Sequence, residues 1–213
     1  MKLDNYKDYK KYSVKIYDIR MAMSVLNWDQ ETKMPKGGAQ QRARQISTLS
    51  GIAHELLTDH AFKSKVRDLN ECLDELNTEE SVNINETFKQ IERAEKLDTD
   101  FVTLRSALVS ETYQAWTDAR AKKSFSVYQE QLDKLIQLKK EEAERIGYNG
   151  HIYDALLEEF EPGMNSAMVD KIFDGVKNHL QPILKKINAQ KKPDDSFLFK
   201  HFNKYLFEII YLQ

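Results

Sequence analysis

The five histidines of this chain are the residues that could most directly hold a catalytic metal. Two histidines four positions apart on a helix face the same side and can both bind zinc, while a glutamate between them activates water. The sequence contains no His-Glu-x-x-His. The nearest stretch begins at His54-Glu55, but Thr58 stands where the second histidine is needed, and His60 falls nearly on the opposite side of a helix. We therefore interpret His54 and His60 as surface or interhelical residues.

Carboxylates are the other abundant reactive groups. Glu158, Glu159 and Glu161 lie close together, and paired carboxylates can perform acid and base chemistry. No periodic burial surrounds them that would shift their pKa values, so we interpret them as a solvated face. Lys139-Lys140-Glu141-Glu142 similarly indicates a surface crossed by ion pairs. A helical metal site built from Glu-x-x-His is excluded as well, because that spacing does not occur.

The composition is typical of a helical protein of the cytoplasm. The 34 acidic and 32 basic residues leave a net charge of −2, without the clustered basic excess that nucleic-acid binding requires. Only 7 glycines and 4 prolines occur in 213 residues, and the single cysteine, Cys72, excludes an intrachain disulfide. The amino terminus lacks the apolar core of a signal peptide, and no apolar run is long enough to span a membrane. We expect neither nucleic acid nor membrane as a partner.

Apolar residues recur at steps of three and four along most of the chain. In a first helix of about residues 5–31 they form one stripe, which we expect later helices to cover: Val14, Tyr17, Met21, Val25 and Trp28. Further stripes predict helices at about 39–57, 62–76, 84–94, 101–119, 126–146, 151–160 and 169–187. The sequence thus predicts an all-α fold, a single domain over 1–213 of about eight or nine mostly antiparallel helices.

Residues 191–213 form a divergent apolar tail. A helical stripe there needs a covering surface, and its members are Leu198, Phe202, Tyr205, Ile209 and Leu212. We expect residues 197–212 to pack into the bundle or against another copy of the chain.

Three separated stretches carry a family pattern. The first reads Trp28-Asp29-Gln30-Glu31-Thr32-Lys33-Met34-Pro35, with Gly37-Gly38 and Arg42 after it. The second is Trp116-Thr117-Asp118-Ala119-Arg120, and the third runs from Ala143 to Met164 and includes Glu158-Glu159-Phe160-Glu161-Pro162-Gly163. Together they resemble the thermostable zinc carboxypeptidases, the carboxypeptidase Taq family, over roughly residues 5–190.

The resemblance implies a helical, cytoplasmic, homodimeric metallopeptidase that uses zinc to release carboxyl-terminal residues from peptides. The family's His-Glu-x-x-His, His-Pro-Phe and Asp-x-Arg-x-Thr signatures are absent here. The chain therefore resembles the amino-terminal portion of such an enzyme, and we expect it to bind no zinc and to be inactive alone. Trp28, His151 and Tyr153 are candidates for lining a peptide groove, although both tryptophans, Trp28 and Trp116, also suit helix–helix anchors. The alternative function is a helical interaction or dimerisation module.

Overall fold

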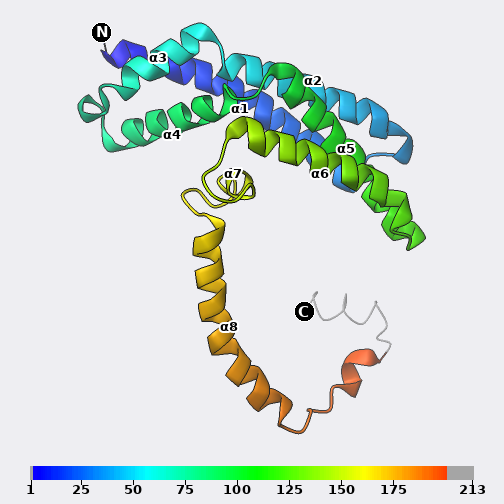
Figure 1. Ribbon diagram of the computed structural model, residues 1–213. Helices are drawn as coiled ribbons and strands as arrows, with labels where there is room; N and C mark the ends of the chain where they lie inside the picture. Colours follow the sequence, from blue (N-terminus) through cyan, green and yellow to red (C-terminus); the bar gives the residue numbers. More distant parts are fainter. Residues whose placement is uncertain (1, 201–213) are drawn as a thin grey trace, which may run out of the picture. The chain divides into compact units, whose positions relative to one another are not determined.

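The computed structural model describes residues 2–200, which contain helices and connections but no strand. The all-α prediction is confirmed. Within those residues lie eight α-helices (Figure 1): α1 Lys2–Thr32, α2 Ala39–Leu57, α3 His60–Asn70, α4 Thr78–Ala94, α5 Thr99–Lys122, α6 Ser126–Ile146, α7 Asp154–Leu157 and α8 Ser166–Asn188. Short 3-10 turns occupy Lys36–Gly38, Leu73–Glu75 and Ser196–Phe199.

The internal contacts of the chain divide it into two compact units, residues 1–163 and residues 164–213. The first unit holds α1 to α7, and the second holds α8. The single domain predicted for residues 1–213 stays a prediction. Most of the hydrophobic tail stripe lies at residues 202–212, outside the described residues, so its predicted packing also stays a prediction.

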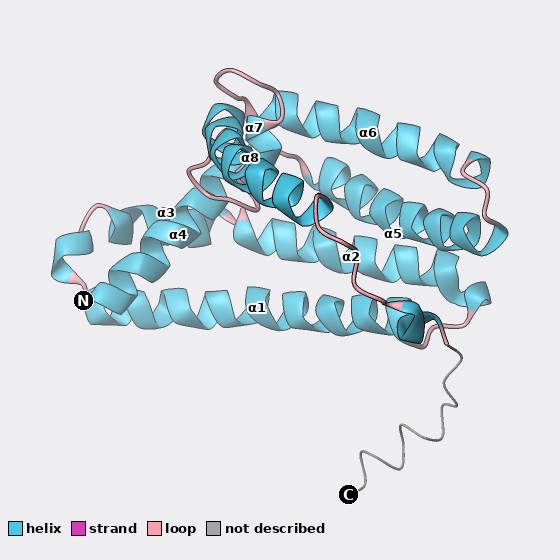
Figure 2. Ribbon diagram, turned by 90° about the horizontal axis from the view of Figure 1, so that it is seen from below, coloured by secondary structure: helices cyan, strands magenta, loops and turns pink. Residues whose placement is uncertain are grey.

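Four long helices lie side by side in the first unit (Figure 2). Helix α2 contacts α1 on one side and α5 on the other, and α5 in turn contacts α6. Helices α3 and α4 pack on each other, and α3 contacts α1. The short α7 packs against α6. Neighbours joined by short connections run antiparallel, as predicted.

Two buried clusters hold these helices together. One joins α1, α3 and α4 around Phe62, whose ring lies 6.0 Å from that of Tyr9 and 5.5 Å from that of Tyr12. The other joins the start of α5 to the end of α6 and to α7, and it contains Leu97, Phe101, Val102, Leu138, Ala143, Ile146 and Ala155. Both clusters contain residues that are far apart in the sequence. Their burial therefore determines which helices lie next to each other.

Helices α2 and α5 approach each other closely at Gly51. A Cβ atom added there would lie only 2.8 Å from Cγ2 of Thr103. Small polar residues flank this contact: the Ser106 hydroxyl donates to Oγ of Ser50 over 2.8 Å, and the Ser47 hydroxyl donates to the Thr103 carbonyl over 2.9 Å. Glycine and serine therefore set the spacing of the two central helices, where larger side chains have no room.

Several helices begin at side chains that cap their free amide groups. The Asp59 carboxylate accepts from the Phe62 amide over 2.9 Å, and Asn77 forms a capping box with Glu80. Ser126 and Gln129 have the spacing of a capping box, but α6 begins at Ser126 without a side-chain cap. The helix expected to continue to residue 76 instead ends at Asn70 and is followed by a 3-10 turn.

The outer side of α1 is apolar and exposed. The residues expected to be covered by later helices, Val14, Tyr17, Met21, Val25 and Trp28, are between 41% and 63% exposed. Helix α1 instead packs on the bundle through its other side, where Tyr9 and Ile16 are 6% and 4% exposed. The helices of the first unit do not provide the expected coverage, because α1 carries apolar residues on two sides and packs on that unit through only one of them.

Candidate functional site

The structure places the three groove candidates on two parts of the first unit. Trp28 is exposed near the end of α1, whereas His151 and Tyr153 are exposed in the connection between α6 and α7. Nδ1 of His151 accepts from the Tyr153 amide over 3.1 Å, which orients the imidazole locally. Among the described residues, no hydrogen bond or ring contact links Trp28 to either of the others. All three are accessible, and they do not form one cluster.

The first family-like stretch locks the end of α1 onto its neighbours. The Arg42 guanidinium of α2 donates to the Asp29 carboxylate over 2.6 Å and also to the carbonyl of Leu26. The next residue, Gln30, accepts from the Ser110 hydroxyl of α5 over 2.7 Å. These polar bonds join α1 to α2 and α5 directly beside the exposed Trp28. The stretch therefore positions the end of α1.

The third family-like stretch holds the end of α6 against the start of α5. The Arg145 guanidinium lies 4.4 Å from the centre of the Phe101 ring and donates to the Asp98 carboxylate over 2.6 Å. The pKa of Asp98 is held below its usual value by the hydrogen bond from the Phe101 amide and then by Arg145. The Lys96 ammonium donates to the Ile146 carbonyl over 2.7 Å, which satisfies the helix end. The start of α5 and the end of α6 are thus held together.

The loop after α7 is closed by one of its glutamates. The Glu158 carboxylate accepts from the Gly163 amide over 2.8 Å, and Gly163 has a φ of +79°, which favours glycine. Glu158, Glu159 and Glu161 are exposed, which confirms their interpretation as a solvated face. The bond to Glu158 and the positive φ of Gly163 together turn the chain here.

Trp116 does not anchor the core. Its indole is 39% exposed, and the Arg120 guanidinium lies 5.1 Å from the indole ring centre. The Tyr113 ring is its other aromatic neighbour, at 5.7 Å. The interpretation of Trp28 and Trp116 as buried helix anchors is wrong, because both lie on outward sides of their helices.

One carboxylate of the predicted surface run is completely buried. Glu142 of α6 is paired with Arg105 of α5 and, over 2.7 Å, with Lys139 one turn earlier. Burial raises the pKa of Glu142, but the bonds and charges of Lys139 and Arg105 outweigh it and hold that pKa below the usual value. The surface interpretation is therefore wrong at Glu142. The pattern could not reveal this, since Arg105 lies on another helix.

The histidines within residues 2–200 lie in separate environments. His54 is buried at the end of α2 and hydrogen-bonds the backbone of Leu97, while His60 is exposed at the start of α3. Their interpretation as interhelical and surface residues is confirmed. Across the described residues no group of three histidine, cysteine, aspartate or glutamate side chains is placed to hold a metal ion. The donors present in that part of the chain therefore do not fit a catalytic zinc.

The His54 imidazole should make stability depend on pH. Burial, the largest influence, lowers its pKa below the ordinary 6.5. The unfolded chain then binds a proton on His54 more readily than the folded chain does. The contribution of neutral His54 to the free energy of unfolding is therefore complete above the ordinary pKa, and it is lost as pH falls through the folded pKa. Denaturant unfolding at about pH 7.5 and about pH 5 should show a larger loss for the native chain than for His54→Gln. Equal losses would contradict the prediction.

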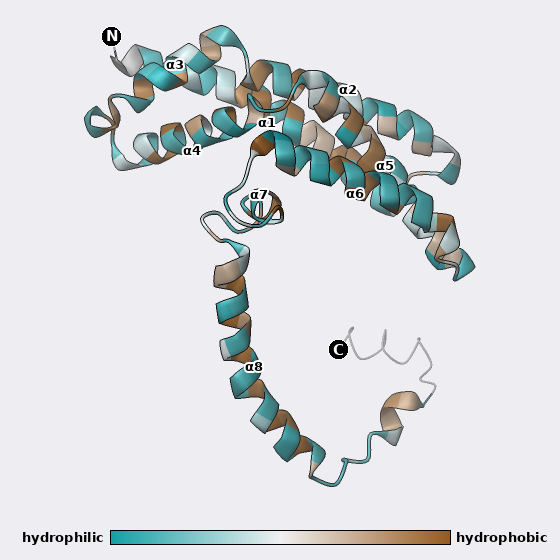
Figure 3. Ribbon diagram, in the orientation of Figure 1, coloured by the Kyte–Doolittle hydropathy of each residue, from teal (hydrophilic) through white to brown (hydrophobic). Residues whose placement is uncertain are grey.

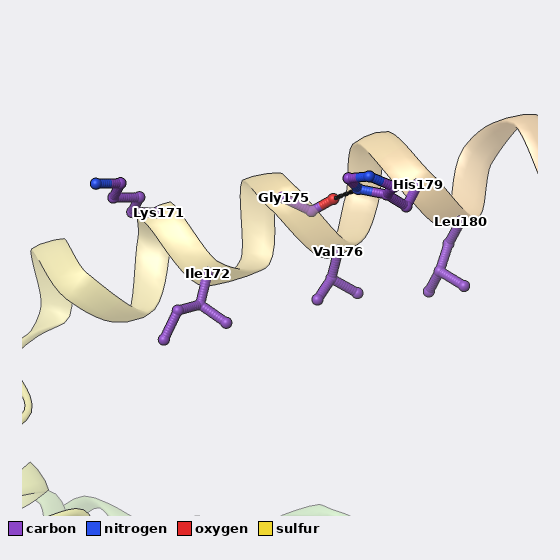
Figure 4. A pocket seen from close by; sticks show the side chains of 6 residues that line it. All are labelled: Lys171, Ile172, Gly175, Val176, His179 and Leu180. Atoms are coloured by element: carbon purple, nitrogen blue, oxygen red, sulfur yellow. Dashed lines mark hydrogen bonds between the residues drawn. The ribbon is translucent and has the colours of Figure 1, made fainter.

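One hollow in the described part of the second unit is lined by residues of α8 (Figure 4). Ile172, Val176 and Leu180 point to the same side of that helix, and Lys171 and His179 lie on other sides. Nδ1 of His179 bonds the Gly175 carbonyl at 2.7 Å. A hollow bounded by one helix cannot enclose a small molecule, so it is not a small-molecule binding pocket.

Comparison with known proteins decides the family. The family model described as carboxypeptidase Taq (M32) metallopeptidase matches residues 8–208. This chain belongs to the M32 family. Its three family-like stretches are therefore M32 sequence, and in the structure the first and the third hold helix ends in place.

The M32 relatives are much longer than this chain. Carboxypeptidase 1 of Bacillus subtilis is 32% identical over 184 residues, which is 86% of this chain and 37% of the relative. Thermostable carboxypeptidase 1 of Pyrococcus furiosus is 36% identical over 178 residues, 84% of this chain and 36% of the relative. The chain thus spans somewhat more than a third of these M32 proteins.

Solved M32 structures agree with the fold. The crystal structure of BsuCP matches with a TM-score of 0.92 and 30% identity, over 98% of this chain and 42% of that chain. The structure of the Pyrococcus furiosus carboxypeptidase matches with a TM-score of 0.73 over 87% of this chain. No described helix is long and apolar enough to cross a membrane.

Proposed function

We propose that this chain is the portion of an M32 metallocarboxypeptidase that builds one wall of a peptide groove, while the catalytic metal is held elsewhere in the fold. The observation that carries the proposal is the 32% to 36% identity with two carboxypeptidases over more than four fifths of the chain. The substrates would be peptides, shortened from the carboxyl terminus.

The chemistry would depend on residues that this chain does not supply. Metal-dependent peptide hydrolysis needs a metal to activate water and to polarise the peptide carbonyl. The sequence has no His-Glu-x-x-His, and the donors described above do not fit such a site. We therefore propose that the chain alone is inactive, that zinc belongs to the complete enzyme, and that the enzyme is a cytoplasmic homodimer.

The contribution of this chain would be to position the peptide. Trp28, His151 and Tyr153 are all exposed, and the hydrogen-bonded helix ends beside them are rigidly held. Aromatic and imidazole groups on fixed supports suit contact with a peptide, since they bury large surfaces at little entropic cost. We propose these three residues as groove-lining contacts.

A chimera tests this proposal. Residues 1–190 would replace the matching region of the Bacillus subtilis carboxypeptidase 1, and release of carboxyl-terminal residues from a peptide pool would be measured. We expect a chelator-sensitive peptidase in which Trp28→Ala or Tyr153→Ala lowers kcat/KM at least threefold. Val82→Ala, an exposed apolar residue on α4, is the matched control. A folded chimera without activity would contradict the proposal.

The isolated chain provides the complementary measurement. After dialysis we expect no stoichiometric metal by elemental mass spectrometry and no release of residues from the same peptide pool. Near-stoichiometric zinc together with chelator-sensitive release would refute the proposal that the catalytic metal is held outside this chain. It would direct attention to His54, His60 and His151.

The second candidate function is a helical interaction or dimerisation module. The exposed apolar side of α1 and the apolar side of α8 favour it, because such surfaces mark contacts with other proteins. This candidate is compatible with the first, since an enzyme portion can carry both a groove wall and a docking surface.

A further inference from the structure

The turn that carries His151 and Tyr153 is held together by its own bonds. It follows Gly147 and Gly150, whose φ angles of +82° and +106° favour glycine. The Asp154 amide donates to the His151 carbonyl over 2.9 Å, and the Asp154 carboxylate accepts from the His151 amide over 3.3 Å. These bonds fix the shape of the turn, but they are local. They do not set the direction in which the turn presents its side chains to a peptide.

The turn leads into α7, and the two together, residues 151–157, are here called the α7 segment. Helix α7 has four residues, whereas an isolated helix shorter than about 12–15 residues is marginal in water. Its hydrophobic part is brown in Figure 3. Ala155 belongs to the buried cluster shared with α5 and α6, and Ile152 and Leu156 pack against that cluster. The hydrophobic effect has no direction, so this burial attaches the segment without specifying its orientation.

A directional contact comes from Arg93 near the end of α4. Its Nη1 donates to the Ala155 carbonyl over 3.0 Å, and its Nη2 lies 4.0 Å from Oε2 of Glu159. Nη2 is buried and has no hydrogen-bond partner within residues 2–200. A guanidinium presents its donors in a rigid planar fork, and a hydrogen bond weakens steeply when it is misaligned. The bond to Ala155 therefore favours one orientation of the α7 segment.

Helix α4 gives Arg93 a firm support. Ile84 and Ile91 are 0% and 1% exposed in the buried cluster that α4 shares with α1 and α3. The Glu95 carboxylate, just after the helix, accepts from the Lys63 ammonium of α3 over 2.6 Å. Arg93 thus projects from a well-packed helix and connects it to the α7 segment, which packs in the other buried cluster.

We propose that Arg93 is a positioning residue of the peptide groove, whose guanidinium fixes the direction in which the α7 segment presents His151 and Tyr153. Arg93 acts through this segment and touches no peptide itself. Without its bond to the Ala155 carbonyl the segment would sample several orientations, and a bound peptide would have to select one of them. This change weakens binding and leaves the reacting groups in place. The inference rests on the groove function proposed above.

Hydrogen exchange of the full chain, measured by mass spectrometry, tests the attachment. In Arg93→Ala we expect the amides of residues 151–163 to exchange at least about tenfold faster, while α2 and α5 keep their native rates. Arg93→Lys should recover part of the protection, because an ammonium can still donate one bond to the Ala155 carbonyl. The matched control is Arg67→Ala on α3, whose side chain is 51% exposed and pairs with Glu95.

Two outcomes of this measurement would overturn the proposal. One is unchanged exchange of residues 151–163 in Arg93→Ala, or an equal increase in Arg67→Ala. The other is faster exchange throughout the first unit, which would show that Arg93 supports the fold as a whole and not the α7 segment.

Kinetics of the chimera described above test the consequence for peptides. Arg93→Ala should raise KM at least threefold and change kcat less than twofold, and Arg93→Lys should restore part of the affinity. Adding Tyr153→Ala to Arg93→Ala should cost less than the two single effects together, because both act on the same peptide contact. A loss confined to kcat, or fully additive effects, would refute the positioning role.

The two proposals fail separately. An active chimera in which neither Tyr153→Ala nor Arg93→Ala changes KM would end the groove function of the α7 segment. A chimera in which Tyr153→Ala raises KM and Arg93→Ala does not would leave the groove function standing and would end the positioning role of Arg93.

Discussion

Replacing Glu142 by glutamine is expected to lower the free energy of unfolding by about 2–3 kcal/mol. Glutamine keeps the shape of the side chain but removes the charge that Arg105 and Lys139 share. Breaking a buried ion pair leaves the remaining charges poorly compensated. The expected loss of stability is moderate for such a change, because 26% of the Arg105 side chain and 33% of the Lys139 side chain are exposed and water can solvate their charges. Urea unfolding at neutral pH measures it.

The matched control lies on the same helix. Glu130 pairs with Lys134 at the surface, so Glu130→Gln should change stability little. The native chain should also lose stability on acidification as pH falls through the folded pKa of Glu142, which is lower than in the unfolded chain. Glu142→Gln should lack that part of the loss. Equal effects of both substitutions would show that Glu142 is not a buried charge.

Gly51→Leu is expected to cost about 2–4 kcal/mol or to prevent folding of the first unit. Even a Cβ atom at this position would lie 2.8 Å from the Thr103 methyl group, so a branched side chain must push α2 and α5 apart. This shift would also break the serine hydrogen bonds beside the contact. Thermal unfolding followed by circular dichroism measures the loss.

Gly175→Leu separates this clash from the general effect of replacing a helical glycine. Gly175 lies in α8, and a Cβ atom there meets nothing within 4 Å. Leucine is a better helix former than glycine, so this variant should be neutral or slightly stabilising. A loss in Gly175→Leu as large as in Gly51→Leu would contradict the steric explanation.

Helical periodicity predicted the elements well but not their neighbours. The stripe on α1 is real, and the first helix has nearly the expected bounds, yet the stripe faces outward in the described chain. Periodicity reports that a side of a helix is apolar, without specifying what covers it. Tyr9 and Ile16, which bind α1 to the bundle, belong to a second stripe that the first one obscured.

The candidate site was predictable only through the family pattern. Asp29 and Arg42 were recognisable as M32 residues, but their ion pair depends on how α1 and α2 meet after the turn at Pro35. Glu142 was misassigned for the same reason, because its decisive partner, Arg105, lies 37 positions away. Charge patterns along one helix report local pairs, whereas burial depends on tertiary packing.

The apolar sides of α1 and α8 that are exposed to water also affect how the stability of this chain varies with temperature. Unfolding raises the heat capacity only through apolar surface that folding had removed from water. Both sides are already about half exposed in the folded chain, so they add less to that increase than buried side chains do. The heat-capacity increment should therefore fall below the usual value of about 12–15 cal/mol/K per residue. A smaller increment flattens the curve of unfolding free energy against temperature. The stability of a chain with these apolar sides uncovered would therefore vary little over a broad temperature range, without a sharp maximum.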